Sequence, residues 1–243
     1  MRIIKVDAID STNSYARELF RRDPFEKAVC IVAKEQLKGR GQRGTHWNSR
    51  PGQNLTFSVV LPKPQVSLSH QFLLSAAVAT SLVRTLRLLH IPRLKLKWPN
   101  DIMAANYKIG GILIENSVSE GVLAASILGI GLNVNQTDFG NLPSASSLKL
   151  LTGQHYVLEE ILDKVLDQIE KDFKEISDSR EATIMEAYKK KLFRKGVAST
   201  FQRADKSFFT GIIEDVSLEG LLTVRTESGT QEVFDLKEVR LCF

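Results

Sequence analysis

The spacing of hydrophobic and polar positions predicts alternating helices and strands over the first 192 residues. Polar residues at 10–13 can cap a helix over residues 14–20. The apolar stretch 68–90 is long enough for a central buried helix, and residues 158–173 and 181–192 also have helical spacing. Extended segments with alternating or β-branched residues are predicted at 28–34, 55–61, 94–98, 109–115 and 122–128.

The pattern changes after Gly196. Short β-rich segments follow at 198–203, 208–216, 221–225 and 232–234, and turn-forming pairs such as Glu219-Gly220 separate them. Short strands at regular spacing are typical of a small barrel. We therefore expect an α+β protein, with a mixed β-sheet flanked by helices in residues 1–192 and an SH3-like β-barrel in residues 193–243.

Residues 36–54 have no sustained helical or extended period, which predicts a long loop with a functional role. The loop contains Gly-Arg-Gly-Gln-Arg-Gly at 39–44. Glycines let a ligand approach the backbone closely, and arginines offer forked donors for phosphate or carboxylate. The segment lacks the Gly-Lys-Ser/Thr ending of a Walker A loop and the glycine spacing of the dinucleotide-binding fingerprint. Taken alone, it is also compatible with a flexible basic surface loop.

Three further segments place polar groups beside strands. Lys-Trp-Pro-Asn-Asp at 97–101 ends a strand, because its proline has no N–H to donate to a ladder. Lys108 enters a strand that carries Gly110 and Gly111, and a partly buried lysine there needs an anion or another hydrogen-bonding partner. Gly-Ile-Gly-Leu-Asn at 129–133 fits a wall for a planar ligand. Each segment alone is also compatible with an ordinary turn, an exposed lysine at a strand end or a tight sheet corner.

Composition narrows the class of protein. Hydrophobic residues make up 43% of the chain and charged residues 25%, which predicts a globular domain with a sizeable core. The two cysteines and four histidines are scattered without metal-ligand spacing, so we expect free thiols and no built-in metal site. We find no secretory signal and no apolar run long enough to span a bilayer, and we expect a cytoplasmic protein with no membrane partner.

The net charge is +5, and five basic residues crowd one short glycine-rich segment: Lys34, Lys38, Arg40, Arg43 and Arg50. A basic balance is compatible with nucleic acid or with anionic small substrates. The position of these cations in a glycine-rich loop favours the second interpretation.

Together and in this order, the segments resemble the biotin protein ligases: Asp-Ser-Thr-Asn at 10–13, Gly-Arg-Gly-Gln-Arg-Gly at 39–44, Trp47, Lys-Trp-Pro-Asn-Asp at 97–101, Lys-Ile-Gly-Gly-Ile-Leu-Ile-Glu at 108–115 and Gly-Ile-Gly-Leu-Asn at 129–133. The motifs fall within residues 7–135, and the two-domain plan extends the resemblance over nearly the whole chain. The resemblance implies a catalytic domain like that of class II aminoacyl-tRNA synthetases. It also implies an enzyme that activates biotin with ATP as biotinyl-5′-AMP, releases diphosphate, and transfers biotin to a lysine of a biotin carboxyl carrier domain, usually that of acetyl-CoA carboxylase.

Site residues follow from the resemblance, position by position. Biotin would contact Ser11, Thr12, Asn13, Gln36, Gly39, Arg40, Gly41, Gln42, Lys108, Gly111 and Ile112. The short polar side chains suit the ureido ring, which has one carbonyl and two N–H groups, and Ile112 would support the apolar ring. ATP would contact Arg40, Arg43, Trp47, Asn100, Lys108 and Asn133.

The resemblance also implies how these residues catalyse the reaction. Two like charges about 4 Å apart repel by about 4 kcal/mol at an effective dielectric near 20, so cations must bring biotin carboxylate and phosphate together. Arg40, Arg43 and Lys108 are the predicted cations, and Asp101 is predicted to orient or deprotonate the acceptor lysine. Mg²⁺ would accompany ATP, held by phosphate oxygens, water and Asp101.

Some features separate the chain from its possible relatives. Gln42, Thr45 and His46 stand where basic residues are often found in the family, which predicts faster release of the adenylate. The motif at 10–13 begins within a dozen residues of Met1, so we expect the ligase-only form without a helix-turn-helix and without specific DNA binding. Family members are often homodimers, and residues 121–128 could form a pairing edge.

Two other functions are compatible with parts of the sequence. A lipoate protein ligase would share the catalytic fold, but its glycine loop has a different pattern. A nucleic-acid-binding protein could use the basic loop and the barrel, yet Phe201, Phe208 and Phe209 are expected to fill the barrel core.

Overall fold

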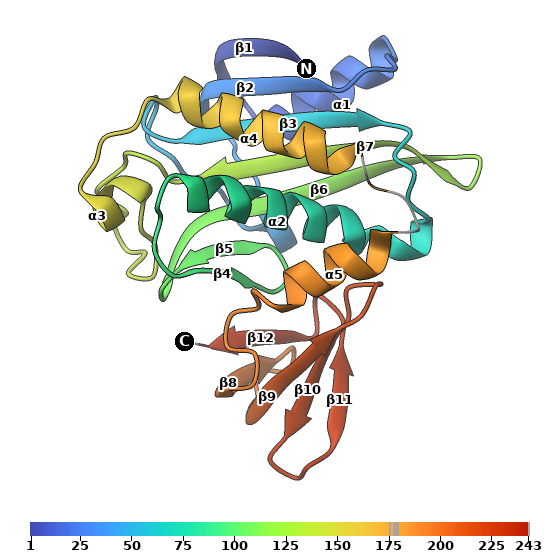
Figure 1. The fold of residues 1–243 in the computed structure, drawn as a ribbon, viewed down its shortest axis with the longest axis vertical. Helices are drawn as coiled ribbons and strands as arrows, with labels where there is room; N and C mark the ends of the chain where they lie inside the picture. Colours follow the sequence, from blue (N-terminus) through green and yellow to red (C-terminus); the bar gives the residue numbers. More distant parts are fainter. Residues whose placement is uncertain (175, 177–179, 243) are drawn as a thin grey trace.

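A computed structural model describes residues 1–174, 176 and 180–242. Figure 1 shows a sheet covered by helices, with a smaller all-strand unit below it. The elements of the first part are β1 (Arg2–Ile9), α1 (Thr12–Arg22), β2 (Val29–Gln36), η1 (Gln42–Gly44), β3 (Leu55–Pro62), η2 (Leu68–His70), α2 (Phe72–Leu88), β4 (Leu94–Lys97), β5 (Asp101–Ala104), β6 (Tyr107–Ser119), β7 (Val122–Leu132), α3 (Leu148–Thr152), α4 (Leu158–Phe173) and α5 (Glu181–Lys189). Those of the second part are β8 (Ala198–Arg203), β9 (Phe208–Val216), β10 (Leu222–Thr226), β11 (Gln231–Phe234) and β12 (Val239–Cys242).

The large sheet is mixed, as the sequence predicts. Among the described residues it has seven strands in the order β1-β2-β3-β7-β6-β5-β4. The β1–β2 pair is parallel, and the other pairs are antiparallel. The parallel pair arises because α1 connects the two strands, which is the crossover that parallel strands require.

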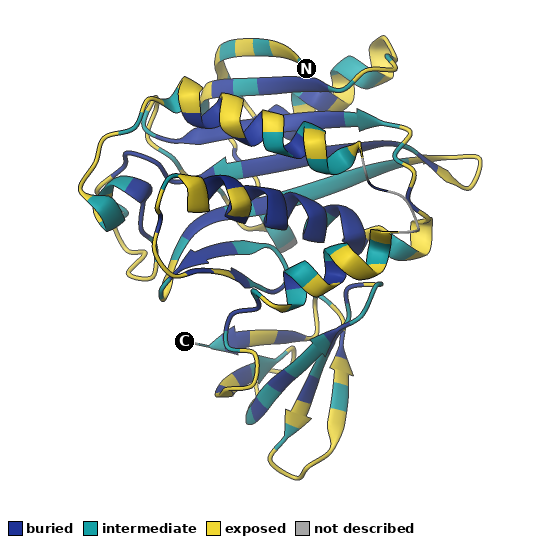
Figure 2. Cartoon of the chain, viewed as in Figure 1, coloured by how far each residue is buried: buried dark blue, intermediate teal, exposed yellow. Residues whose placement is uncertain are grey.

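Helices cover the two faces of the sheet differently. Helices α2 and α4 lie on one face, where the larger core cluster buries residues such as Leu74 and Leu166 (Figures 1 and 2). Helix α1 lies on the other face, where Ala16 packs against a small cluster that includes Ala125 and Ile127. Because β3 is covered from both sides, residues 55–60 of that strand are all buried, including the polar side chains of Thr56 and Ser58.

Helix α1 covers only part of its face of the sheet. Side chains on a strand alternate between faces, so Gly129 and Gly131 continue the row of Ala125 and Ile127 along β7. Gly111 of β6 pairs with Gly131 across the sheet. Three glycines therefore replace side chains just beyond the N-terminus of α1, and they leave the sheet hollowed there.

Several short elements and some element ends differ from those expected from the sequence. Strands β1, β5 and β12 and helix α3 were not predicted. The predicted helix over 181–192 ends at Lys189. The predicted loop over 36–54 is confirmed from residue 37 on, apart from the single turn η1 and a bridge between Arg40 and His46, whereas Gln36 still belongs to β2.

The second unit is an open sheet rather than the closed barrel that the sequence predicts. Its described strands pair antiparallel in the order β11-β10-β9-β8-β12, and none of these pairings joins β11 to β12. Phe201 is buried and stacks on Phe209, as expected for core residues. Phe208, also expected in the core, is 65% exposed because alternation turns it to the solvent side of β9.

The small sheet is fastened to the end of β4. The indole Nε1 of Trp98 donates to the carbonyl oxygen of Gly220 at 2.9 Å, in a buried contact. Gly220 has a φ of +91°, and a Cβ there would lie 2.6 Å from the ring of Phe72 on α2, so only glycine fits. The chain between the units also pairs with β4, since Phe193 N–H donates to the Leu96 carbonyl at 2.8 Å. These contacts bring β12 beside the hollowed face of the large sheet.

No helix in the described part of the chain is long and apolar enough to cross a bilayer.

Candidate functional site

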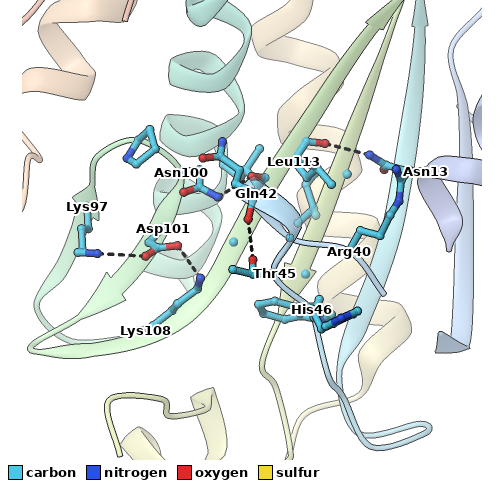
Figure 3. Close-up of a pocket in the computed structure, with 18 of the residues that line it drawn as sticks. Asn13, Arg40, Gln42, Thr45, His46, Lys97, Asn100, Asp101, Lys108 and Leu113 are labelled. Carbon is cyan, nitrogen blue, oxygen red and sulfur yellow. Dashed lines mark hydrogen bonds and ion pairs between the residues drawn. The ribbon is translucent and has the colours of Figure 1, made fainter. Parts of the chain in front are cut away.

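A cavity of about 270 Å³ lies on the hollowed face of the large sheet (Figure 3). Its floor includes the three glycines Gly111, Gly129 and Gly131. The other lining residues come from α1 and its cap, the glycine-rich loop, the turn after β4, and strands β2, β4, β5, β6, β7 and β12: Ser11, Thr12, Asn13, Gln36, Arg40, Gly41, Gln42, Thr45, His46, Trp47, Lys97, Trp98, Pro99, Asn100, Asp101, Lys108, Ile112, Leu113, Ile130, Val239, Arg240 and Leu241. Segments that are far apart in the sequence thus meet in one place.

Most of the residues selected from the sequence line this cavity, and three need separate comment. Gly39 of the loop is not among the lining residues, and a Cβ there would lie 2.3 Å from the Trp47 carbonyl oxygen. Asn133 is buried and donates from Nδ2 to the Ser146 carbonyl at 3.0 Å, so it holds the following loop. The side chain of Arg43 lies outside the described part of the structure.

Ile112 faces the cavity with its main chain only. It belongs to the larger core cluster on the α2 face, and alternation along β6 turns Gly111 and Leu113 to the cavity side instead. The resemblance implied that the Ile112 side chain supports an apolar ring. Leu113 holds that side-chain position in the structure (Figure 3).

A network of hydrogen bonds fixes the polar end of the cavity at the N-terminus of α1. The Gln36 Oε1 atom accepts from the Thr12 backbone N–H at 2.8 Å and from the Thr12 hydroxyl at 3.0 Å. Asn13 donates from Nδ2 to the Leu113 carbonyl at 3.1 Å, and its Oδ1 accepts from the Ser58 hydroxyl at 2.6 Å. Ser11, Thr12 and Asn13 are all nearly buried, so this end has preset donor and acceptor positions.

At the other end, one carboxylate lies between two lysines. Asp101 Oδ1 is 2.6 Å from Lys108 Nζ, and Asp101 Oδ2 is 3.5 Å from Lys97 Nζ (Figure 3). Burial lowers the pKa of Lys97, and the nearby charge of Asp101 opposes that shift. Two cations against one anion leave this end with a net positive charge.

The glycine-rich loop folds back on itself over the cavity. Gly41 N–H donates to the Thr45 carbonyl at 2.7 Å, and Trp47 N–H donates to the Gly39 carbonyl at 2.9 Å. A Cβ on Gly41 would lie 2.4 Å from Thr45 Oγ1, which explains why glycine is needed there. The Trp47 ring lies on Gly131, where a Cβ would be 2.4 Å from its Cε2 atom, and Lys108 Nζ is 5.9 Å from the ring centroid.

Arg40 and Lys108 share the cavity, but different carboxylates hold them. Arg40 Nη2 is 2.9 Å from Glu115 Oε2, whereas Lys108 pairs with Asp101. The two cations therefore stand at opposite sides of the loop in Figure 3.

Sequence reasoning missed four residues with a place at or behind this site. Lys97 belongs to the motif Lys-Trp-Pro-Asn-Asp at 97–101. Its position four residues before Asp101 could have indicated that the two side chains meet. Ser58 and Glu115 act only through tertiary contacts with Asn13 and Arg40. Arg240 lies on β12, an element that the sequence pattern did not predict.

Comparisons with known proteins agree with this geometry. Residues 6–133 match the model of the biotin/lipoate A/B protein ligase family. The chain is 31% identical over 231 residues to biotin–[acetyl-CoA-carboxylase] ligase of Paracoccus denitrificans, covering 92% of this chain and 94% of that protein. It is 27% identical over 237 residues to the bifunctional ligase/repressor BirA of Bacillus spizizenii, covering 96% of this chain and 72% of that protein.

The fold comparison leads to the same family. The structure of the biotin protein ligase from Aquifex aeolicus in complex with biotin and ATP superposes with a TM-score of 0.81 at 26% identity, covering 99% of this chain and 98% of that one. The matched family region contains α1, the glycine-rich loop, β6 and β7, which together form most of the cavity described above. The chain therefore belongs to the biotin/lipoate A/B protein ligase family, as a relative of the biotin protein ligases within it.

Proposed function

We propose that the chain is an ATP-dependent biotin protein ligase. It would join biotin to ATP as biotinyl-5′-AMP and then transfer the biotinyl group to a lysine of a carrier domain. The observation that carries the proposal is the cavity itself, which has a preset polar end at α1, a glycine floor and a positively charged end at Lys108. A lipoate ligase is not favoured, because the relatives and solved structures reported above are biotin ligases.

Biotin would lie with its ureido ring at the α1 end. Ser11, Thr12, Asn13 and Gln36 offer donors and acceptors there, and the loop backbone at Gly41 covers them. The apolar ring and chain would lie over the glycine floor, beside the exposed face of Leu113. Two of the glycines serve this arrangement indirectly, because a Cβ on Gly129 would collide with Asn13 and a Cβ on Gly131 would collide with the Trp47 ring.

ATP would take the other end of the cavity. Trp47 and Lys108 lie there, and we propose that Trp47 packs on the adenine. Asn100 donates from Nδ2 to the Ile112 carbonyl at 2.9 Å, so its Oδ1 atom is oriented by the sheet. Arg43 remains a predicted phosphate ligand, and Asn133 is proposed to act by shaping the adjoining loop.

In the first step a biotin carboxylate oxygen attacks the α-phosphorus, and the bond from that phosphorus to the diphosphate oxygen breaks. Lys108 would offset the repulsion between the two anions and hold them in line. In the second step the acceptor amine attacks the acyl carbon, the bond from that carbon to AMP oxygen breaks, and the amine loses a proton. Lys108 would then stabilise the negative charge on the acyl oxygen.

Mg²⁺ fits this site only as a companion of ATP. Asp101 is the one carboxylate among the described residues that line the cavity, and both of its oxygens already face lysines. Groups of three or more His, Cys, Asp or Glu side chains suited to a metal are absent from the described residues. Phosphate oxygens and water would therefore supply most of the ligands, as Mg²⁺ prefers, with Asp101 near by.

Asp101 is proposed to position the lysines, because each of its two oxygens lies beside a lysine ammonium group. We expect Asp101→Asn to slow both half-reactions, each by about tenfold, since loss of one charged hydrogen bond costs that much. Diphosphate release measures the first, and single-turnover transfer from preformed adenylate measures the second. A loss confined to transfer would instead identify Asp101 as the base for the acceptor lysine.

Gln42 lines the cavity where a longer cation would reach the phosphate. We expect Gln42→Arg to slow release of biotinyl-AMP by about tenfold, because one added charge-assisted hydrogen bond stabilises the complex by that factor. The adenylate off-rate, followed by filter retention of labelled intermediate, measures the effect. An unchanged off-rate would show that position 42 does not contact the adenylate.

Several finer points remain part of the proposal. The two-unit division at 192–193 and the SH3-like character of the C-terminal unit are supported by its strand order, in which the last strand lies beside the first. The acceptor is proposed to be the carrier domain of acetyl-CoA carboxylase or of another biotin-dependent carboxylase. A cytoplasmic location, a homodimer and the lack of specific DNA binding stay predictions.

The direct test is to incubate the protein with biotin, Mg-ATP and a carrier domain, and to read intact mass. One biotinyl group on the carrier, dependent on both substrates, supports the proposal. An unmodified carrier together with no biotin-dependent diphosphate release would reject it.

A further inference from the structure

Glu115 of β6 lies behind the cavity and holds two of its residues with one oxygen. Its Oε2 atom accepts from Arg40 Nη2 at 2.9 Å and from Asn13 Nδ2 at 2.7 Å. Its other oxygen pairs with Arg17 of α1. Glu115 does not belong to the described cavity lining, and its side chain is 21% exposed, so it acts on a ligand only through these partners.

The contact with Asn13 fixes which way that amide points. Both of its N–H groups are used, one by Glu115 and one by the Leu113 carbonyl. Its Oδ1 atom accepts from the Ser58 hydroxyl at 2.6 Å and keeps a second lone pair. Asn13 is therefore held as an acceptor, which suits an N–H of a bound ligand.

The contact with Arg40 ties the glycine-rich loop to the sheet. The loop's first residues are anchored by backbone bonds, from Leu37 N–H to the Ile9 carbonyl and from Lys38 N–H to the Asp10 carbonyl. Its far end is anchored where Arg50 N–H donates to Gln136 Oε1. Between these ends, the Arg40–Glu115 ion pair joins a loop arginine to a rigid strand.

We propose that Glu115 is a positioning residue for biotin. Its carboxylate latches the glycine-rich loop through Arg40 and keeps the Asn13 amide in the acceptor orientation. The inference rests on the proposed function for the identity of the ligand, whereas the latch itself is a property of the free protein. Arg17 on the outer side neutralises part of the charge and restrains the carboxylate from the solvent side.

The test uses Glu115→Gln in the full chain. Glutamine keeps the size but offers an N–H₂ toward groups that are themselves donors. We expect KM for biotin to rise about tenfold, the cost of one charged hydrogen bond, while kcat changes less than about twofold. Glu18→Gln on α1, which removes the exposed Glu18–Arg21 pair, is the matched control and leaves both constants unchanged. Equal KM for biotin in wild type and Glu115→Gln would overturn the proposal.

A second readout needs no ligand. Amide hydrogen exchange over residues 39–47 should be faster in Glu115→Gln than in wild type. Arg40→Gln breaks the same ion pair from the loop side and should accelerate exchange equally, and the double variant should add nothing further. Unchanged exchange in Arg40→Gln, or additive effects in the double variant, would overturn the latch even if Glu115→Gln folds poorly. A wild-type protein without biotin-dependent diphosphate release would instead reject the proposed function, and the exchange results would still decide on the latch.

Discussion

Lys108→Met is expected to lower kcat for adenylate formation by about 10²–10³-fold, the range found when one preorganised electrostatic group is removed from an active site. Lys108 is the cation that pairs with Asp101 at 2.6 Å and lies near the Trp47 ring. Methionine keeps an unbranched apolar side chain, one atom shorter, but cannot offset the repulsion between a carboxylate and a phosphate. Biotin-dependent diphosphate release, with biotin and ATP varied separately, gives the measurement.

We expect the loss of kcat in Lys108→Met to occur in a folded protein. Lys97 still pairs with Asp101 in the variant, so the carboxylate keeps one cationic neighbour. Lys95→Met is the matched control, because Lys95 lies on β4, separated from β6 only by β5, but is exposed and outside the described cavity lining. Full activity in Lys108→Met would remove Lys108 from the mechanism, and an equal loss in Lys95→Met would assign the effect to stability.

The sequence was enough to predict the mixed sheet and its cavity because the relevant signals are local. Glycines that interrupt apolar strands, as at positions 111, 129 and 131, mark places where something approaches the backbone. The glycine-rich loop stands out in the same way, since it has no period of its own. These features depend on a few neighbouring residues, so they can be read without knowing the fold.

Other parts could not be predicted because they depend on contacts between distant segments. Ile112 and Leu113 are both apolar, and only the sheet register decides which one faces the cavity. The short strand β12 has no strong pattern, and it forms because β8 offers an edge for pairing. In the sequence Glu115 looks like an ordinary strand residue, and only the folded chain shows that α1 and the loop place three donors beside its side chain.

Gly129→Ala is expected to raise KM for biotin by about 100-fold, because the added methyl group would collide with the side chain of Asn13, which the hydrogen-bond network at the N-terminus of α1 holds in place. An added Cβ would lie 2.2 Å from Asn13 Oδ1 and 2.8 Å from its Cγ. Asn13 cannot yield easily, because its partners Ser58 and Leu113 are the residues that flank Gly129 in the sheet register. Displacing the amide would break two or three hydrogen bonds at once, each worth about 1 kcal/mol, and tenfold in binding corresponds to about 1.4 kcal/mol.

The comparison with Gly111→Ala separates a local collision from a general effect of adding a methyl group to the floor. A Cβ on Gly111 would meet its nearest atoms at 3.6 Å, an ordinary contact, so we expect a clearly smaller rise in KM for that variant. Overpacking at Gly129 should also lower the free energy of unfolding by about 1–3 kcal/mol, which denaturant titration measures. Equal KM values for the two variants would mean that the cavity tolerates a shifted Asn13, and the polar end would then not be preset by the α1 network.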